Sequence, residues 1–290
     1  MEEAKIKCAP KVSIIMGIYN CADTLEDAVN SILEQSFTDW EFIMCDDGST
    51  DRTLEVARRY VAKYPDKFII LQNGKNQGLN YTLNHCLKYA RGEYVARMDG
   101  DDLSLPERFE KEVVFLDNHP EYAIVSTPMI FFDDKGDWGC SKAIEIPKIK
   151  DFVNHAPFHC HAPCMIRKEA YLAVGGYTVD KRLLRFEDCN LWYKLYAADY
   201  RGYNLQEPLY KMRDDRNAYH RRTPSARMRG VYVQWSGFRM VKMPFRYYPY
   251  LLFEFFKDLV IVLMPEKIYM SLHKKKQRIG RRNIEEENYV

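Results

Sequence analysis

The regular alternation of short apolar runs with helical patterns constrains the fold of this 290-residue chain more than any other feature. The apolar runs cover residues 12–18, 40–45, 68–71 and 94–98. Short unbroken runs of this kind are typical of strands buried on both faces of a sheet. Helical patterns lie between them, including residues 53–64 and 76–90. Strands that alternate with helices predict an α/β fold with a mainly parallel sheet flanked by helices.

Polar, turn-forming residues follow three of the predicted strands. The clusters are Tyr19-Asn20, Asp46-Asp47-Gly48 and Asp99-Gly100-Asp101. In open α/β sheets, ligands bind at the carboxyl ends of the strands, and these ends meet at one edge of the sheet. The three clusters therefore predict a binding site at that edge.

Asp99 and Asp101 could together hold a metal ion. Carboxylates two residues apart in an extended segment point to the same side. Mg²⁺ and Mn²⁺ prefer oxygen ligands and commonly combine one or two carboxylates with substrate phosphates. An isolated Asp-x-Asp is more often a solvated turn, but its place at a strand end beside two other polar clusters favours a cation site. The role of Asp102 is left open.

Asp47 is a candidate for recognising a nucleotide base. A carboxylate only accepts hydrogen bonds, so it suits the imide N–H of uracil or thymine, or the N–H edge of guanine. Tyr19 could stack on such a base. The alternative is that Asp47 caps the next turn and Asp51 caps the helix, and base recognition and capping could both hold for this segment.

Glu187 and Asp188 begin a predicted helix over residues 187–198. A reaction in which a hydroxyl group attacks a substrate requires a base that removes the hydroxyl proton, and this pair is the best candidate. Acidic residues are also favoured at helix N-termini for electrostatic reasons alone. Because a helix start lowers the pKa of a carboxyl group, a base placed there needs burial to offset that effect.

The C-terminal part of the chain differs in composition. We place a boundary near residue 215, which separates a catalytic domain (1–215) from a helical, aromatic and basic extension (216–290). No acidic residue occurs from 216 to 253, and the apolar stretch 250–264 is shorter than the ~20 residues of a spanning helix. This stretch could pack on the catalytic domain or lie in a membrane interface. No recognition motif supports binding to nucleic acid.

Composition adds a prediction about the compartment. The formal net charge is only +2, and the eight cysteines are scattered. No apolar stretch of signal-peptide type stands at the N-terminus. We therefore expect mostly reduced cysteines and a cytoplasmic protein, with peripheral attachment to the inner face of the cell membrane if the extension binds lipid. The segment His159-Cys160-His161-Ala162-Pro163-Cys164 offers zinc ligands, but no second ligand pair follows at the usual spacing.

Taken in order, the motifs resemble glycosyltransferase family 2 over about residues 10–215. The resemblance rests on VSIIMGIYN (12–20), DDGSTD (46–51), NQG (76–78), GEY (92–94) leading to DGDD (99–102), GGY (175–177) and EDCNLW (187–192). It implies the Rossmann-like GT-A fold, with a nucleotide-sugar half at about 10–128 and an acceptor half at about 129–215. It also implies an inverting transfer from a nucleotide sugar, assisted by a divalent metal, Mn²⁺ or Mg²⁺.

The resemblance also assigns roles to individual residues. Tyr19 and Asp47 would hold the base, Asn76 and Gly78 would lie near the donor, Asp99 would contact the ribose, diphosphate or metal, and Asp101 would bind the metal. Asp188 would be the catalytic base, with His161 and Glu187 on the acceptor side. The chain departs from the family at Gly17, where proline is usual, and at Asn190, where aspartate is usual.

The resemblance predicts a bacterial-type enzyme that moves a sugar, most simply from a UDP-sugar, to a hydroxyl of a glycan or lipid-linked acceptor in surface polysaccharide biosynthesis. Two alternatives come from other functional classes. One is a catalytically silent domain that acts as a binding or scaffold subunit, although Asp101 and Asp188 are both present. The other is a nucleotidyltransferase, although residues 19–23 lack the glycine-rich, basic phosphate loop usual in that class.

Overall fold

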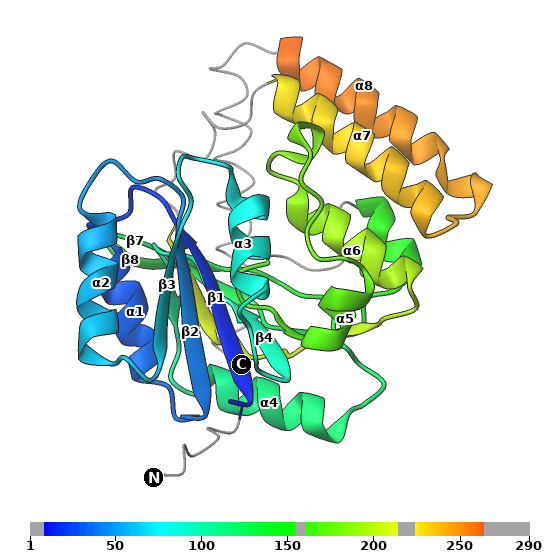
Figure 1. Cartoon of the computed structure of the whole chain (residues 1–290). Coiled ribbons are helices and arrows are strands. Elements are labelled where there is room, and N and C mark those ends of the chain that lie inside the picture. The colour runs from blue at the N-terminus through cyan, green and yellow to red at the C-terminus, as the bar shows by residue number, and fades with distance from the viewer. Residues whose placement is uncertain (1–8, 155–160, 214–223, 264–290) are drawn as a thin grey trace.

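The computed structural model describes residues 9–154, 161–213 and 224–263 (Figure 1). Its core is a seven-stranded sheet in which β9 alone runs antiparallel to its neighbours. The mainly parallel sheet predicted from the sequence is confirmed. In spatial order the strands are β10 (Gly202–Asn204), β6 (Ile124–Ser126), β9 (Met165–Arg167), β4 (Tyr94–Arg97), β1 (Val12–Ile18), β2 (Trp40–Asp46) and β3 (Phe68–Gln72).

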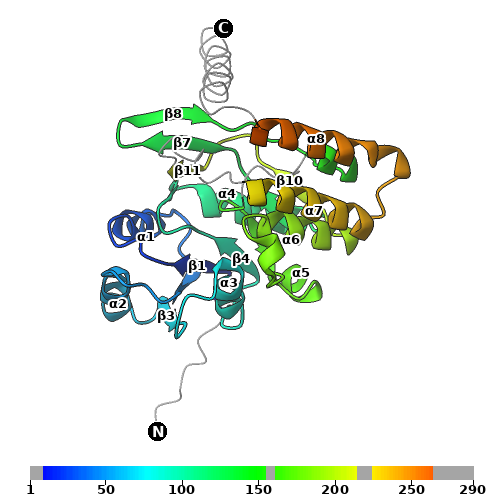
Figure 2. The ribbon, with the colours of Figure 1, turned by 90° about the horizontal axis from the view of Figure 1, so that it is seen from above.

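Helices cover both faces of this sheet (Figures 1 and 2). Alternate side chains of a strand point to opposite faces, so Ile14 and Met16 of β1 join one apolar cluster and Ile15 joins the other. The Ile14 face packs against α1 (Leu25–Leu33), α2 (Thr53–Lys63) and α4 (Arg108–Asn118). The Ile15 face packs against α3 (Leu79–Leu87), α5 (Lys168–Ala173) and α6 (Glu187–Ala197).

A second sheet of four strands adjoins the carboxyl end of β4. Its order is β5 (Leu103–Ser104), β11 (Tyr210–Arg213), β7 (Met129–Asp133) and β8 (Gly136–Cys140). Strand β5 begins directly after residues 99–102, and it pairs antiparallel with β11 from far along the chain. The acidic segment, defined here as residues 99–102, therefore joins the two sheets.

Two further helices, α7 (Pro224–Met240) and α8 (Pro249–Leu263), run side by side next to α6. A Cβ atom added to Gly237 of α7 would come within 2.2 Å of the Tyr193 ring, so α7 approaches α6 closely at this glycine. Leu251 of α8 belongs to the buried core. The described part of the extension is therefore helical, as predicted, whereas the proposed boundary near 215 falls outside the described residues.

Short 3₁₀ helices complete the described chain: η1 (Ile149–Asn154), η2 (Lys181–Leu183) and η4 (Phe245–Tyr247). Within the three described ranges, no helix combines the length and the apolar character needed to cross a bilayer.

Candidate active site

Hydrogen bonds tie together the loops that follow β1, β2 and β4. The backbone N–H of Asn20 donates to Oγ of Ser49 at 3.1 Å, and its Oδ1 accepts from the N–H of Thr50 at 2.8 Å. The hydroxyl of Thr24 donates to the carbonyl oxygen of Gly100 at 2.8 Å. The three polar clusters predicted to meet at one edge of the sheet are thus in contact through their loops.

Asp47 lies at this edge and holds the start of α3. Its side chain is buried, with Oδ1 accepting from Asn73 Nδ2 and from the N–H of Gln77, both at 2.8 Å. Oδ2 accepts from the N–H of Gly78 at 2.9 Å. Gly78 precedes the helix with a positive φ of 89°, which glycine adopts without strain. Asn76, in the same loop, is exposed.

The capping alternative for this loop agrees with the structure only in part. Oδ1 of Asp51 accepts from the N–H of Thr53, the first residue of α2, at 2.9 Å, but the N-cap position itself is Arg52. The turn after β2 is closed by Asp46, whose carboxylate accepts from the N–H of Ser49, because the Asp47 carboxylate points to α3 instead. Tyr19 keeps 48% of its surface exposed at this edge, so its ring is open to a ligand.

Arg97, the last residue of β4, is the functional candidate that the sequence reading missed. Its side chain is buried, and Nη2 donates to Oδ1 of Asp99 at 2.5 Å. The same positive charge lowers the pKa of Asp101, Glu187 and Asp188, opposing the larger effect of burial on each. One buried guanidinium therefore contacts the acidic segment at Asp99 and acts electrostatically on the proposed base, Asp188. The available signal was an arginine inside an otherwise apolar run.

Arg108 of α4 holds the backbone of Arg97 in place. Its guanidinium is fully buried and pairs with Glu112 one helical turn later, with 3.2 Å between Nε and Oε1. Nη2 also donates to the carbonyl oxygens of Arg97 at 3.1 Å and of Ala162 at 3.4 Å. The end of β4 is thereby joined to the segment that carries His161.

Burial and neighbouring negative charge raise the pKa of two carboxyl groups in the acidic segment, Asp101 and Asp102. Reduced hydration and the nearby negative charge of Asp99 raise the pKa of Asp101, although Asp101 keeps contact with solvent. Burial raises the pKa of Asp102 further, and the charges of Asp99 and Asp101 add to this effect. Oδ1 of Asp102 accepts from the N–H of Arg213 at 2.8 Å. Asp102 therefore joins the acidic segment to β11, which gives it a structural role.

The acidic segment suits a divalent cation that shares its coordination with a substrate. No three His, Cys, Asp or Glu side chains come together as a metal cage among the described residues. Asp99 and Asp101 instead form a pair whose mutual repulsion a cation would relieve. Two carboxylates that leave room for phosphate oxygens match the coordination habit of Mg²⁺ and Mn²⁺.

Glu187 and Asp188 lie in the first turn of α6, and the charge of Arg97 acts on both. Burial raises the pKa of Asp188, while the N–H of Cys189, which donates to Oδ1 at 2.7 Å, lowers it. Asp188 is half-buried, and its reduced hydration outweighs the lowering effect of the helix start on its pKa. Burial also raises the pKa of Glu187, whose Oε2 is buried and has no hydrogen-bond partner among the described residues.

His161 lies beneath the same region in a buried position. Its Nε2 is 2.5 Å from the hydroxyl of Tyr177, and its ring packs edge-on against Trp192. Burial lowers the pKa of His161 well below its usual value, and the charge of Arg97 lowers it further, so the imidazole is neutral at pH 7. His159 and Cys160 lie outside the described residues, so the zinc alternative stays untested.

The two departures from the family pattern have different surroundings. A Cβ atom on Gly17 would lie 3.1 Å from side-chain atoms of both Leu79 and Thr82, so this glycine lets α3 pack closely on β1. Asn190 is buried one turn from Glu187, and its Oδ1 has no hydrogen-bond partner in the described part of the chain.

Residues 13–175 match the sequence model of the family described as Glycosyl transferase family 2. The chain belongs to this family. EpsE of Bacillus subtilis (strain 168) is 43% identical over 267 residues, which cover 92% of the chain and 94% of EpsE. The amylovoran biosynthesis glycosyltransferase AmsE of Erwinia amylovora is 31% identical over 206 residues, or 69% of the chain and 75% of AmsE. The protein is therefore a glycosyltransferase.

Solved structures share the fold of this family 2 glycosyltransferase. S. aureus TarS 1-349 in complex with UDP-GlcNAc has a TM-score of 0.62 at 19% identity, over 89% of this chain and 82% of that one. The mannosyltransferase PcManGT from Pyrobaculum calidifontis, in complex with GDP-Man and Mn²⁺, has a TM-score of 0.63 at 22% identity, over 84% and 68%. The GT-A fold expected from the sequence is thereby confirmed.

Proposed function

We propose that this glycosyltransferase transfers a sugar from a UDP-sugar, with inversion and with the aid of Mn²⁺ or Mg²⁺, to a hydroxyl of a glycan or lipid-linked acceptor. The observation that carries the proposal is the position of Arg97, which lies against Asp99 and acts electrostatically on Asp101 and Asp188. The charge of Arg97 thus acts both on the residues proposed to hold the donor diphosphate and on the proposed base. We place this transfer in polysaccharide biosynthesis because the relative AmsE is named an amylovoran biosynthesis glycosyltransferase.

The residues divide the reaction between them. Asp99 and Asp101 would hold the cation together with the donor diphosphate, and a bound cation would offset the negative charge that develops as the diphosphate departs. Asp188 takes the proton of the acceptor hydroxyl. The acceptor oxygen then forms a bond to the anomeric carbon from the side opposite the breaking bond to the diphosphate oxygen. A single in-line displacement of this kind inverts the configuration.

Lone-pair counting at Asp47 supports uracil as the base. A carboxylate oxygen has about two acceptor positions, and Oδ1 already accepts from Asn73 and Gln77. Oδ2 accepts from Gly78 and keeps one position free. One N–H can therefore be received. The imide of uracil presents a single N–H, whereas guanine presents two adjacent N–H groups that require two free oxygens.

We expect UDP to bind at least about tenfold more tightly than GDP or CDP, because one hydrogen bond to a charged group contributes about 1.5–3 kcal/mol. UDP methylated at N3 of uracil should lose this advantage, whereas UDP methylated at C5 keeps its N–H and should retain it. Calorimetric titration with Mn²⁺ present measures all five ligands. Equal affinity for UDP and its N3-methyl form would overturn the role of Asp47, and no binding of any nucleoside diphosphate would overturn the proposed function.

We propose that the outer face of α8 attaches the protein to the inner face of the cell membrane. Leu251 faces the core, and Phe255 is half-buried. The outer residues Leu252, Phe253 and Phe256 are 62%, 63% and 58% exposed. A helix that is apolar on both sides is rarely left in water. The lack of acidic residues from 216 to 253 adds attraction to anionic lipid.

The triple variant Leu252→Ser, Phe253→Ser, Phe256→Ser should float with phosphatidylglycerol vesicles at least about tenfold less than the wild type, because each buried apolar side chain contributes about 1.5–3 kcal/mol. These side chains are exposed, so the fold should be unaffected. Leu172, Val179 and Leu184 are similarly exposed away from α8, and their serine variants form the matched control. Equal flotation of wild type and the α8 variant would remove the membrane proposal. A wild-type dimer that the variant abolishes, without flotation, would reassign the face to self-association.

A further inference from the structure

We propose that Asn84 of α3 is a positioning residue that fixes His161 through Tyr177. Nδ2 of Asn84 donates to the carbonyl oxygen of Tyr177, and Oδ1 accepts from the N–H of Tyr177, both at 2.8 Å. Two bonds to one residue fix both the position and the orientation of its backbone. The inference rests on the proposed function in one respect, namely that His161 lies on the acceptor side.

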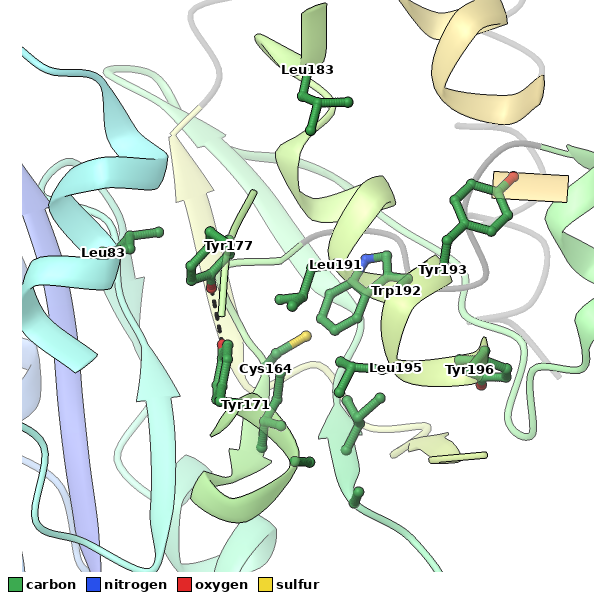
Figure 3. Close-up of a cluster of buried hydrophobic side chains, with 14 of the residues drawn as sticks. Leu83, Cys164, Tyr171, Tyr177, Leu183, Leu191, Trp192, Tyr193, Leu195 and Tyr196 are labelled. Atoms are coloured by element: carbon green, nitrogen blue, oxygen red, sulfur yellow. Dashed lines mark hydrogen bonds between the residues drawn. The ribbon is translucent and has the colours of Figure 1, made fainter. Parts of the chain in front are cut away.

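The side chain of Tyr177 carries the effect to the histidine. Tyr177 is 2% exposed, and its hydroxyl lies 2.5 Å from Nε2 of His161 and 2.9 Å from the hydroxyl of Tyr171. Figure 3 shows the hydroxyls of Tyr177 and Tyr171 facing each other, with Leu83 of α3 to the left of Tyr177. Because the ring has no free space, a shift of the Tyr177 backbone must move its hydroxyl relative to the imidazole.

Asn84 also packs tightly against Gly176, the second glycine of the Gly175-Gly176 pair. A Cβ atom on Gly176 would lie 2.5 Å from Oδ1 of Asn84, so only glycine fits there. Nζ of Lys194 donates to the carbonyl oxygen of Gly176 at 2.6 Å and holds the turn from the α6 side. Gly175 has a similar positive φ, 70° against 64°, but nothing lies within 4 Å of its added Cβ. Of the two glycines, therefore, only Gly176 lies so close to Asn84 that an added side chain would collide with it.

The placement of Asn84 on α3 links the two halves of the site. The N-terminus of this helix is held by Asp47, which accepts from Gly78. Less than two turns into the same helix, Asn84 holds Tyr177. One short rigid helix thus spaces the proposed base-binding residue from His161, so that the donor and acceptor sides are aligned by the same element.

The test observes the imidazole of His161 directly, by NMR of the full-length protein labelled with ¹⁵N-histidine; a His161→Gln variant assigns its resonances. We expect Asn84→Ala to shift the Nε2 resonance of His161 clearly. Asn80→Ala is the matched control, because Asn80 donates from the same helix to the carbonyl oxygen of Thr178 at 2.7 Å but does not bond to Tyr177. Asn84→Ala removes two hydrogen bonds and Asn80→Ala removes one, so both variants should lower the thermal midpoint, but only Asn84→Ala should shift the His161 resonance.

A second pair of variants approaches the contact from the other side. Gly176→Ala should reproduce the shift of the His161 resonance, whereas Gly175→Ala, with the same backbone strain and no contact, should not. If Asn84→Ala fails to fold, this pair still decides the matter. An unchanged His161 resonance in Gly176→Ala and in any folded Asn84 variant would overturn the proposal. UDP affinity should stay within about twofold in all four variants, so a failure to bind UDP in the wild type would count against the proposed function alone.

Discussion

Replacing Asp188 by asparagine should reduce sugar transfer at least about a hundredfold while leaving UDP affinity within about twofold, because a positioned general base contributes about 10²–10⁴ to the rate. Asparagine keeps the size of the side chain and an oxygen that can accept from the N–H of Cys189. It cannot take a proton from the acceptor hydroxyl. Steady-state transfer rates and calorimetric titration with UDP measure the two effects separately.

Glu187→Gln is the matched control for this experiment, because Glu187 stands beside Asp188 in the same helical turn and its pKa is also raised by burial. If Asp188 is the base, the Glu187 variant should retain far more transfer. The reverse ranking would move the role of the base to Glu187, and full activity in both variants would place it elsewhere.

The pH profile of kcat/KM gives an independent measure of the same residue. Burial raises the pKa of Asp188 above the usual value for aspartate, so the inactive protonated form accumulates as the pH falls through this raised pKa. Transfer should therefore be lost on the acid side. Arg97 lowers the pKa of Asp188, so Arg97→Gln should move the acid limb to higher pH. If the acid limb of the profile does not move in the Arg97 variant, Arg97 does not influence the pKa of the catalytic base.

The central sheet was predictable because its strands carry their own signal. Strands buried on both faces read as unbroken apolar runs, and β1, β2, β3 and β4 begin where the sequence predicts. The second sheet carries no such signal. Its strands are short and partly exposed, and β11 pairs with β5 across more than a hundred residues. Pairing over that separation depends on the folded domain rather than on local pattern.

The candidate site was predictable in its parts and not in its connections. Strand ends placed Asp47 and Asp99 correctly, because the ends of parallel strands must meet at one edge. The hydrogen bonds of Asp47 were not predictable in the same way. Its carboxylate uses most of its acceptor positions on the loop before α3, and the position of that loop is set by the folded structure. Arg97 was overlooked because an arginine at a strand end normally reaches solvent, whereas here it is buried beside Asp99.

Replacing Asp101 by asparagine should lower Mn²⁺-dependent hydrolysis of the UDP-sugar at least about a hundredfold, because a cation contributes several kcal/mol to stabilising the departing diphosphate. Asparagine keeps the shape of the side chain but removes the negative charge that a divalent cation requires. Mn²⁺ affinity in the presence of UDP, followed by electron paramagnetic resonance, should weaken in parallel. Asp134→Asn is the control, since Asp134 is a neighbouring carboxylate that is 97% exposed and pairs with Arg213.

A chelator decides whether the loss at Asp101 concerns the cation or only the local charge. If Asp101 acts through the cation, removing the metal from the wild type should lower the rate of hydrolysis about as far as the Asp101→Asn substitution does. Adding the chelator to the variant should then lower its rate of hydrolysis little further. Effects that act on one interaction do not add. If the fold-reductions in hydrolysis caused by the chelator and by the Asp101→Asn substitution instead multiply, Asp101 acts separately from the metal. In that case the repulsion between Asp99 and Asp101 would be relieved in the variant, and Asp99 with Arg97 would have to bind the diphosphate without Asp101.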